Sequence, residues 1–144
     1  MSSVTHPRLH HLALTVTDLD VSVRWYESVF GVTFLMDAPH QGGVGRVLAN
    51  ENRELMIVLH RHDTNGGELF GETSTGLDHA AFVVPTRADL ETWQNHLEVL
   101  GVTMADTADK PLTQSPICDE AYGSVIVFRD PDNIQLELFC PPGA

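Results

Sequence analysis

The sequence of 144 residues has few basic residues and only two cysteines, Cys118 and Cys140. Lysine occurs once, at Lys110, and eight basic residues stand against 20 acidic ones, which gives a formal net charge of -12. Because nucleic-acid binding requires clustered Lys and Arg side chains that neutralise phosphates, this composition argues against a nucleic-acid partner. The two cysteines have no CxxC spacing, and we expect them to be reduced thiols of a cytoplasmic protein.

Long apolar runs are also absent from the sequence. No run approaches the roughly 18 apolar residues that a membrane-spanning helix needs, so we expect no membrane association. The first ten residues, MSSVTHPRLH, lack the basic and apolar regions of a signal peptide. With 42% hydrophobic residues, the chain has the size and composition of a single domain that can bury a core.

What the sequence does contain is an internal repeat. His11 begins the segment HLALTVTDLDVSVRWYESVFGVTF, and His79 begins HAAFVVPTRADLETWQNHLEVLGVTM. In both copies the histidine stands 14 residues before a tryptophan, Trp25 or Trp93. Each copy is typical of an apolar strand, a turn and an amphipathic helix that ends at Gly-Val-Thr. Such a duplication can bring one histidine from each copy to a shared metal site.

Capping signals define two helices. Asp18 is the expected N-cap of a helix that runs to Phe30 and ends at Gly31, and Thr86 is the expected N-cap of a helix that runs to Leu100 and ends at Gly101. Strands are predicted at 8–16, 32–36, 45–49 and 54–61, from residue 78, and at 102–105, 124–129 and 134–139. The pattern predicts an α+β fold of two tandem βαβββ modules, about 8–62 and 77–140, joined by a linker at about 63–76.

Three segments carry a resemblance to a known family. HHLALTVTDL with WYESVFG, then GLDHAAFVV, then YGSVIVFRDPDNIQLELF resemble the vicinal-oxygen-chelate superfamily, from about Leu9 to Phe139. This superfamily includes glyoxalase I, extradiol dioxygenases, methylmalonyl-CoA epimerases, fosfomycin-resistance enzymes and bleomycin-binding proteins. The resemblance implies paired modules whose curved sheets form a cupped cleft, where two substrate oxygens chelate a divalent metal. It also implies pairing of modules within one chain or across a dimer, and we expect a homodimer.

The resemblance assigns three metal ligands. In metal-using members the first strand of a module carries a histidine five residues before a valine, which His11 and Val16 match, as do His79 and Val84. The last strand carries a carboxylate after a turn of the DPDG type, and DPDNIQLEL puts Glu137 at that place. The implied cofactor is Fe²⁺, Mn²⁺, Ni²⁺ or Zn²⁺. Whether His11 and Glu137 would meet in one subunit or across a dimer stays open.

The residue pattern supports this trio independently of the family. Gln135 and Glu137 share one face of a strand whose other face is apolar, and a carboxylate there is costly unless it is paired or ligated. Two imidazoles and one carboxylate form a facial set that suits divalent ions and leaves positions open for substrate. The alternative is that each histidine is a hydrogen-bonded core residue and that Glu137 lies at the surface.

Two candidates for proton transfer are less well defined. In the first repeat, Ile57 or Val58 takes the place of Glu137, and neither can ligate. His60 lies two residues beyond Val58 on the same face, about 7 Å along the strand. It stays open as a fourth ligand, as a base that faces the substrate, or as a surface residue. Tyr122 could donate a proton or hydrogen bond in the cleft, or could pack against a turn.

Three further histidines are expected outside the site. His10 should point to the strand face opposite His11 and serve a structural role. His40, within Pro-His-Gln-Gly-Gly, is expected in a loop that could form a flap over the cleft. His62 is expected to be exposed.

The combined features favour a divalent-metal-dependent enzyme of the glyoxalase or dioxygenase type. Its substrate would be a small oxygenated molecule that chelates the metal, and its chemistry that of a lyase, an isomerase or a ring-cleaving oxygenase. The alternative is a non-catalytic protein that binds a drug or metabolite, as bleomycin-binding relatives do. Those relatives typically lack the metal trio. Fosfomycin-type thiol transfer ranks lower, because basic residues for a phosphonate are sparse.

Overall fold

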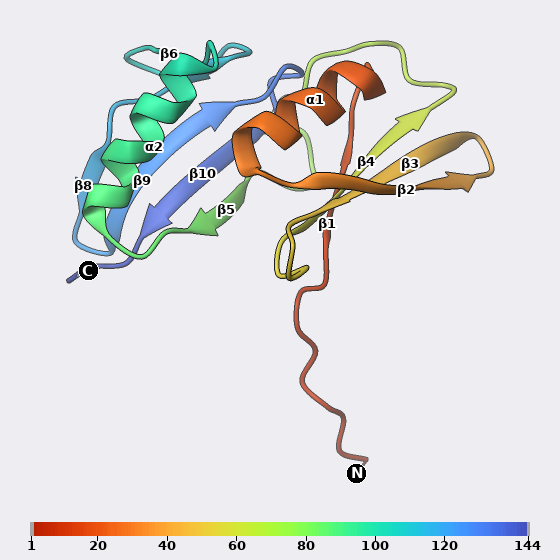
Figure 1. The fold of residues 1–144 in the computed structure, drawn as a ribbon, viewed down its shortest axis with the longest axis horizontal. Coiled ribbons are helices and arrows are strands. Elements are labelled where there is room, and N and C mark those ends of the chain that lie inside the picture. The colour runs from red at the N-terminus through yellow and green to blue at the C-terminus, as the bar shows by residue number, and fades with distance from the viewer. Residues whose placement is uncertain (1, 144) are drawn as a thin grey trace. The chain divides into compact units, whose positions relative to one another are not determined.

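The chain forms an α+β fold, as predicted, in two compact units that divide after Asn65. The structure is a computed structural model that describes residues 2–143. Within these residues each unit contains one helix and one mixed β-sheet (Figure 1). Neither helix has the length and apolar character needed to cross a bilayer. The two units repeat the same succession of a strand, a helix and further strands.

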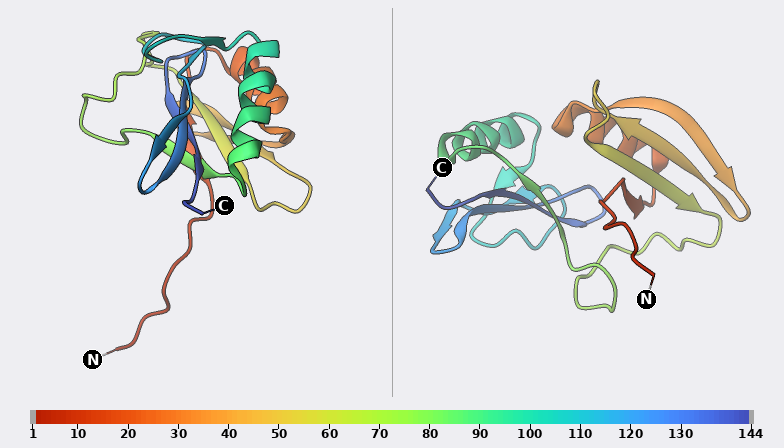
Figure 2. Two further views of the ribbon diagram at one scale, coloured as in Figure 1. Left: turned by 90° about the vertical axis from the view of Figure 1, so that its left-hand side faces the viewer. Right: turned by 90° about the horizontal axis from the view of Figure 1, so that it is seen from below.

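Unit 1 consists of one helix on a four-stranded sheet. Its elements are β1 (Leu12–Thr15), α1 (Leu19–Phe30), β2 (Thr33–His40), β3 (Gly43–Ala49) and β4 (Met56–His62). The strand order is β1-β4-β3-β2, with β1 parallel to β4 and the other pairs antiparallel. Helix α1 contacts β2, β3 and β4 along one face of the sheet (Figure 2, right). The opposite face is therefore left to the side chains that point away from α1.

The bounds of α1 follow from its local capping residues. The Asp18 carboxylate accepts a hydrogen bond from the Val21 backbone N–H at 3.1 Å. Gly31 ends the helix in the left-handed conformation, with φ 68°, and its N–H donates to the Glu27 carbonyl at 3.0 Å. The predicted helix from the Asp18 cap to Phe30 is confirmed. Tyr26 is fully buried on the side of α1 that faces the core.

Unit 2 consists of one helix on a six-stranded sheet. Its elements are β5 (Ala80–Val83), α2 (Arg87–Val99), β6 (Thr103–Met104), β7 (Thr113–Gln114), β8 (Cys118–Glu120), β9 (Gly123–Arg129) and β10 (Gln135–Cys140). The strand order is β5-β10-β9-β7-β6, and β8 pairs with β9. Helix α2 lies along β9 and β10 (Figure 2, right). Leu136 and Leu138 of β10 are buried, whereas Gln135 and Glu137 point to the other, partly exposed face.

A capping box defines the start of α2. The Thr86 hydroxyl accepts from the Asp89 backbone N–H at 3.2 Å, and the Asp89 carboxylate accepts from the Thr86 backbone N–H at 2.9 Å. This confirms Thr86 as the predicted N-cap. The helix ends at Val99 with Leu100 as C-cap, one residue before the predicted end. Gly101 follows with φ 83°.

Several strands differ from their predicted bounds. Strand β1 begins at Leu12, because its pairing with β4 begins where Leu12 lies beside Ile57. His11 therefore precedes the strand, and His79 likewise precedes β5. Strand β2 continues past the predicted end at Met36 to His40, where it forms a tight hairpin with β3. Strands β7 and β8 were not predicted, because two or three polar residues show no readable alternation.

Candidate metal centre

The structure brings two of the three predicted metal ligands together in unit 2. His79 immediately precedes β5, and Glu137 lies in the neighbouring strand β10 beside Ala81. The His79 Nε2 atom is 3.3 Å from the Glu137 Oε2 atom. The two side chains are 38% and 21% exposed, so they are reachable from solvent but partly shielded from it. An imidazole nitrogen and a carboxylate oxygen thus converge on one accessible point.

A hydrogen-bond network fixes the ring of His79. The Asp78 Oδ1 atom accepts from His79 Nδ1 at 2.7 Å and from Gln135 Nε2 at 2.9 Å. Because an ionised carboxylate only accepts hydrogen bonds, the Nδ1 atom of His79 carries a proton. An outer carboxylate that holds one imidazole nitrogen and leaves the other for a metal is a common arrangement around metal ligands. The role of Asp78 was not predicted, although its position next to His79 was a signal for it.

The network continues to the buried Arg129. This guanidinium donates from Nη2 to Gln135 Oε1 at 3.1 Å and forms two hydrogen bonds to Glu72, at 3.0 and 3.1 Å. Its Nε–H donates to the Ala108 carbonyl at 2.6 Å. The hydrogen bonds that Glu72 accepts from Arg129 are the main reason why the pKa of the Glu72 carboxyl falls to about 2. Gln135 is thereby oriented so that its amide N–H points at Asp78.

The strand registers show which residue of unit 1 corresponds to Glu137. Glu137 lies beside Ala81 in unit 2, and Val58 lies beside Ala13 at the equivalent place in unit 1. The counterpart of Glu137 is therefore Val58, which cannot bind a metal. His60, beside Thr15, corresponds to Phe139 rather than to Glu137.

His11 lies in unit 1 as an exposed residue just before β1. Its Nδ1 atom is 2.9 Å from the Nδ1 atom of His10, and the two rings meet edge to face. The prediction that His10 points to the opposite face of a strand is wrong, because β1 begins only at Leu12. His11 therefore lies at a backbone position outside the pairing of β1 with β4.

Tyr122 lies directly before β9 and is 65% exposed. Its ring stacks on Phe139 with centroids 6.4 Å apart. Phe139 shares a face of β10 with Glu137, two residues away. The Tyr122 ring thus packs on a residue of the face that carries Glu137 rather than against a turn, and the proposed role of its hydroxyl stays a prediction.

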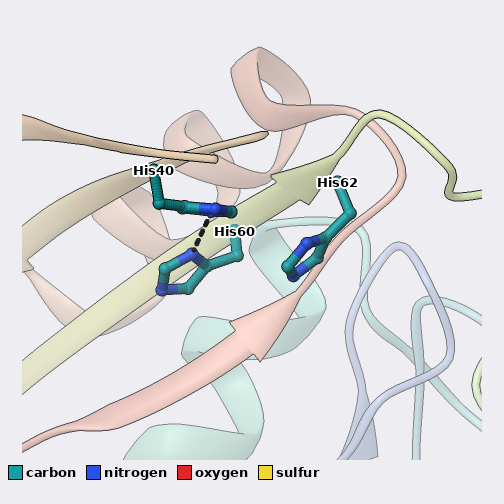
Figure 3. Close-up of side chains that lie close together, drawn as sticks. All are labelled: His40, His60 and His62. Atoms are coloured by element: carbon teal, nitrogen blue, oxygen red, sulfur yellow. Dashed lines mark hydrogen bonds between the residues drawn. The ribbon is translucent and has the colours of Figure 1, made fainter. Parts of the chain in front are cut away.

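A second cluster, which was not predicted, lies in unit 1. His40, His60 and His62 each offer one nitrogen, and these atoms lie within 4.8 Å of one another (Figure 3). The His60 Nδ1 atom is 3.2 Å from the His40 Nε2 atom. His40 is the last residue of β2 rather than part of a loop, and His62 is half-buried rather than exposed. We call these three residues the histidine cluster.

The histidine cluster borders a pocket of about 560 Å³. Ala13 and Thr15 of β1 and Ala38 and Pro39 of β2 complete much of its wall. Burial and the nearby charges of His40, His62 and His11 lower the pKa of His60 below its usual value. His60 is therefore a neutral imidazole near neutral pH, the form that can accept a proton or bind a metal.

Comparison with known proteins places the chain in a family. A domain of the glyoxalase/bleomycin resistance protein/dioxygenase type from Frankia sp. EAN1pec has 31% identity and a TM-score of 0.82, over 97% of this chain and 96% of that one. The fosfomycin resistance protein FosX from Listeria monocytogenes has the same fold at 18% identity, with a TM-score of 0.66 over 96% and 97%. An uncharacterised protein of Pseudomonas aeruginosa is 26% identical over 115 residues, which span 78% of this chain and 79% of that one.

The family model supports the resemblance that the sequence motifs indicated. It matches residues 8–138, which cover both units and contain every candidate ligand described above. The chain is a member of the Glyoxalase/Bleomycin resistance protein/Dioxygenase superfamily.

Proposed function

We propose that the protein is a divalent-metal-dependent enzyme of the glyoxalase or dioxygenase type, with His11, His79 and Glu137 as metal ligands. The observation that carries this proposal is the 3.3 Å approach of His79 Nε2 to Glu137 Oε2. Family membership agrees with it, since the superfamily includes dioxygenases and glyoxalases. A Glu-to-Gln mutant of FosX has been crystallised with Mn(II) and 1S,2S-dihydroxypropylphosphonic acid, which is a precedent for a metal and a small oxygenated ligand on this fold.

The proton positions around His79 fit a cation at this point. Since Nδ1 carries the proton donated to Asp78, the neutral ring presents a lone pair at Nε2 toward the Glu137 carboxylate. Two acceptors 3.3 Å apart repel each other unless a positive charge lies with them. Either a second proton on His79 or a bound metal ion supplies that charge. A nitrogen and a carboxylate donor are ligands that Fe²⁺, Mn²⁺, Ni²⁺ and Zn²⁺ accept.

The residues around the proposed metal ligands would hold these ligands in place and would not take part in the reaction themselves. Asp78 holds the His79 tautomer, and Gln135 holds Asp78. A bound divalent ion would supply Lewis-acid stabilisation of negative charge on substrate oxygens. Arg129, a buried residue on the same face of the sheet as Gln135, is paired with Glu72 and would hold Gln135 in place.

Two side chains are proposed for proton transfer. His60 lines the pocket of unit 1 as a neutral imidazole and can accept a proton from a substrate carbon or hydroxyl. Tyr122, whose ring stacks on Phe139 of the β10 face that carries Glu137, would donate a hydrogen bond to a substrate oxygen. The preferred substrate is a small neutral hydroxyketone, diol or catechol, because the acidic chain repels polyanions.

Turnover with a small substrate panel tests this function. Protein loaded with Mn²⁺, Fe²⁺, Ni²⁺ or Zn²⁺ would be assayed with a hemithioacetal, a hydroxyketone and a catechol. The proposal expects metal-dependent turnover of at least one class, abolished by chelation and by Glu137→Ala. Binding of such molecules with equal affinity before and after chelation, without turnover, would instead identify a non-catalytic binding protein.

A further inference from the structure

We propose that the histidine cluster of His40, His60 and His62 is a second metal site, separate from the site at His79 and Glu137. It would bind a borderline divalent ion such as Zn²⁺ through three imidazole nitrogens. This site lies wholly within unit 1 and uses none of the three ligands assigned above. It therefore goes beyond the proposed function and can be tested independently of it.

The spacing of the nitrogens supports the proposal. Two imidazole nitrogens bound tetrahedrally to Zn²⁺ at about 2.0–2.1 Å lie roughly 3.3 Å apart. The His40 Nε2 and His60 Nδ1 atoms are already 3.2 Å apart. The ring of His62 lies with its centroid 5.1 Å from that of His40 and 6.0 Å from that of His60. A modest rotation of side chains would bring all three nitrogens to one ion.

The tautomer of His40 suits a metal ligand. Its Nδ1–H donates to the Gln41 backbone carbonyl, with the two atoms 3.1 Å apart. Because a carbonyl oxygen only accepts hydrogen bonds, the proton is on Nδ1 and Nε2 presents a lone pair. Metal-ligating histidines generally donate their other ring N–H to a carbonyl or carboxylate in this way. The lone pair at Nε2 is the one that points into the cluster.

The sheet makes room for the three rings through two glycines in its middle strand. Gly43 of β3 lies between His40 of β2 and His62 of β4, and Gly45 lies between Ala38 and His60. A Cβ atom at Gly45 would be 2.8 Å from Cε1 of His60, whose ring supplies its three nearest neighbours. At Gly43 a Cβ atom would meet the Arg61 backbone carbonyl first and Cε1 of His40 next, at 2.9 Å. The His60 imidazole thus occupies the volume that a side chain at position 45 would fill. This arrangement is a shaped site rather than a chance gathering of surface residues.

The donor set indicates which ion would bind. Three imidazoles without a carboxylate favour Zn²⁺, Ni²⁺ or Cu²⁺ over the harder Mn²⁺. Three protein ligands also leave a fourth position for water or a small ligand, and the pocket wall of Ala13, Ala38 and Pro39 borders the cluster. In the metal-bound state His60 is a ligand and cannot act as a base. The two roles of His60 are therefore alternative states of one imidazole.

Zn²⁺ titration of the full chain tests the second site. The parent protein for this titration would be Glu137→Ala, so that the first proposed site does not contribute. Bound metal would be removed with a chelator, and Zn²⁺ binding would be measured by calorimetry. We expect one Zn²⁺ per chain. Adding His62→Ala or His40→Ala should weaken binding by more than the roughly 10- to 100-fold typical for loss of a partner outside the ligand shell. The matched control is His6→Ala, an exposed histidine outside the strands of unit 1.

A variant that removes no ligand adds a sharper test. Gly45→Ala should displace the His60 ring and weaken Zn²⁺ binding about tenfold or more, while the far-UV circular dichroism stays that of the parent. Zn²⁺ affinity that is unchanged in His40→Ala, His62→Ala and Gly45→Ala would overturn the second site. Loss of Mn²⁺ binding in Glu137→Ala with retained Zn²⁺ binding would support both sites. If the proposed site at His79 and Glu137 fails its own test, the Zn²⁺ titration still holds, because the Glu137→Ala parent protein already lacks that ligand.

Discussion

His79, directly before β5, and Glu137, within the neighbouring strand β10, have Nε2 and Oε2 3.3 Å apart, while the other ring nitrogen of His79 donates to Asp78 at 2.7 Å. One imidazole thus stands between two carboxylates with different tasks. Asp78 holds the ring, and Glu137 faces its free nitrogen. If Glu137 is the metal ligand that we propose and Asp78 only holds the ring, substitutions of the two residues should have different effects.

Asp78→Asn should weaken metal binding without removing a proposed ligand. The amide would hold the His79 ring less firmly and no longer select its tautomer, because its nitrogen is a donor. We expect the affinity for Mn²⁺ to fall by about 10- to 100-fold, the usual effect of losing such a partner. Asp106→Asn, at an exposed position of the same unit, is the matched control. Equal affinities for Mn²⁺ in Asp78→Asn and the wild type would show that Asp78 does not support metal binding.

Stability should depend on pH through Glu72 and Arg129. The pKa of Glu72 is about 2 in the folded protein against an ordinary value of 4.5, mainly because its carboxylate accepts hydrogen bonds from Arg129. The unfolded chain binds this proton first as pH falls, so the contribution of Glu72 is complete above about pH 4.5 and is lost toward pH 2.

Urea unfolding of metal-free protein would measure this contribution. The difference in unfolding free energy between the wild type and Glu72→Gln should be largest at pH 6 and should shrink at pH 3. Glu68→Gln, at an exposed position of the same segment, should show no such trend. A difference that stays constant between pH 6 and pH 3 would mean that the ion pair does not act through the carboxylate charge.

Loss of the α2 capping box should destabilise unit 2. Thr86→Ala removes the hydroxyl that accepts from the Asp89 N–H and should lower the unfolding free energy by about 1 kcal/mol. Thr92→Ala, within α2 and exposed, removes a hydroxyl without touching a cap and is the control. Equal unfolding midpoints for Thr86→Ala and Thr92→Ala would show that the capping box does not contribute measurably to the stability of unit 2.

Local signals explain why much of the fold could be predicted. The ends of α1 depend on Asp18 and Gly31, and the start of α2 depends on Thr86 with Asp89, all of which contact residues within one turn. The same holds for Asn133, whose φ of 68° closes the turn before β10. Such short-range contacts are visible in a sequence without knowledge of the tertiary structure.

The histidine cluster depends on long-range register and was not predicted. His40 and His60 are 20 residues apart, and they meet because β2 continues to His40 and a bulge between Phe34 and Met36 sets its pairing with β3. The one available signal was the matched period of two in Gly43-Val-Gly45 and His60-Arg-His62. Two glycines opposite two histidines on a neighbouring strand leave room for the imidazole rings. The sequence alone does not show that the two strands are neighbours, so this signal could be interpreted only with the structure.

Mn²⁺ binding to the wild type and to Glu137→Ala, followed by the electron paramagnetic resonance signal of the free ion, tests whether Glu137 is a metal ligand. Glu91→Gln on the exposed side of α2 is the control. We expect the wild type and the control each to bind one Mn²⁺ per chain and Glu137→Ala to lose this ion. Equal Mn²⁺ binding by the wild type and Glu137→Ala, or none by either, would contradict this expectation.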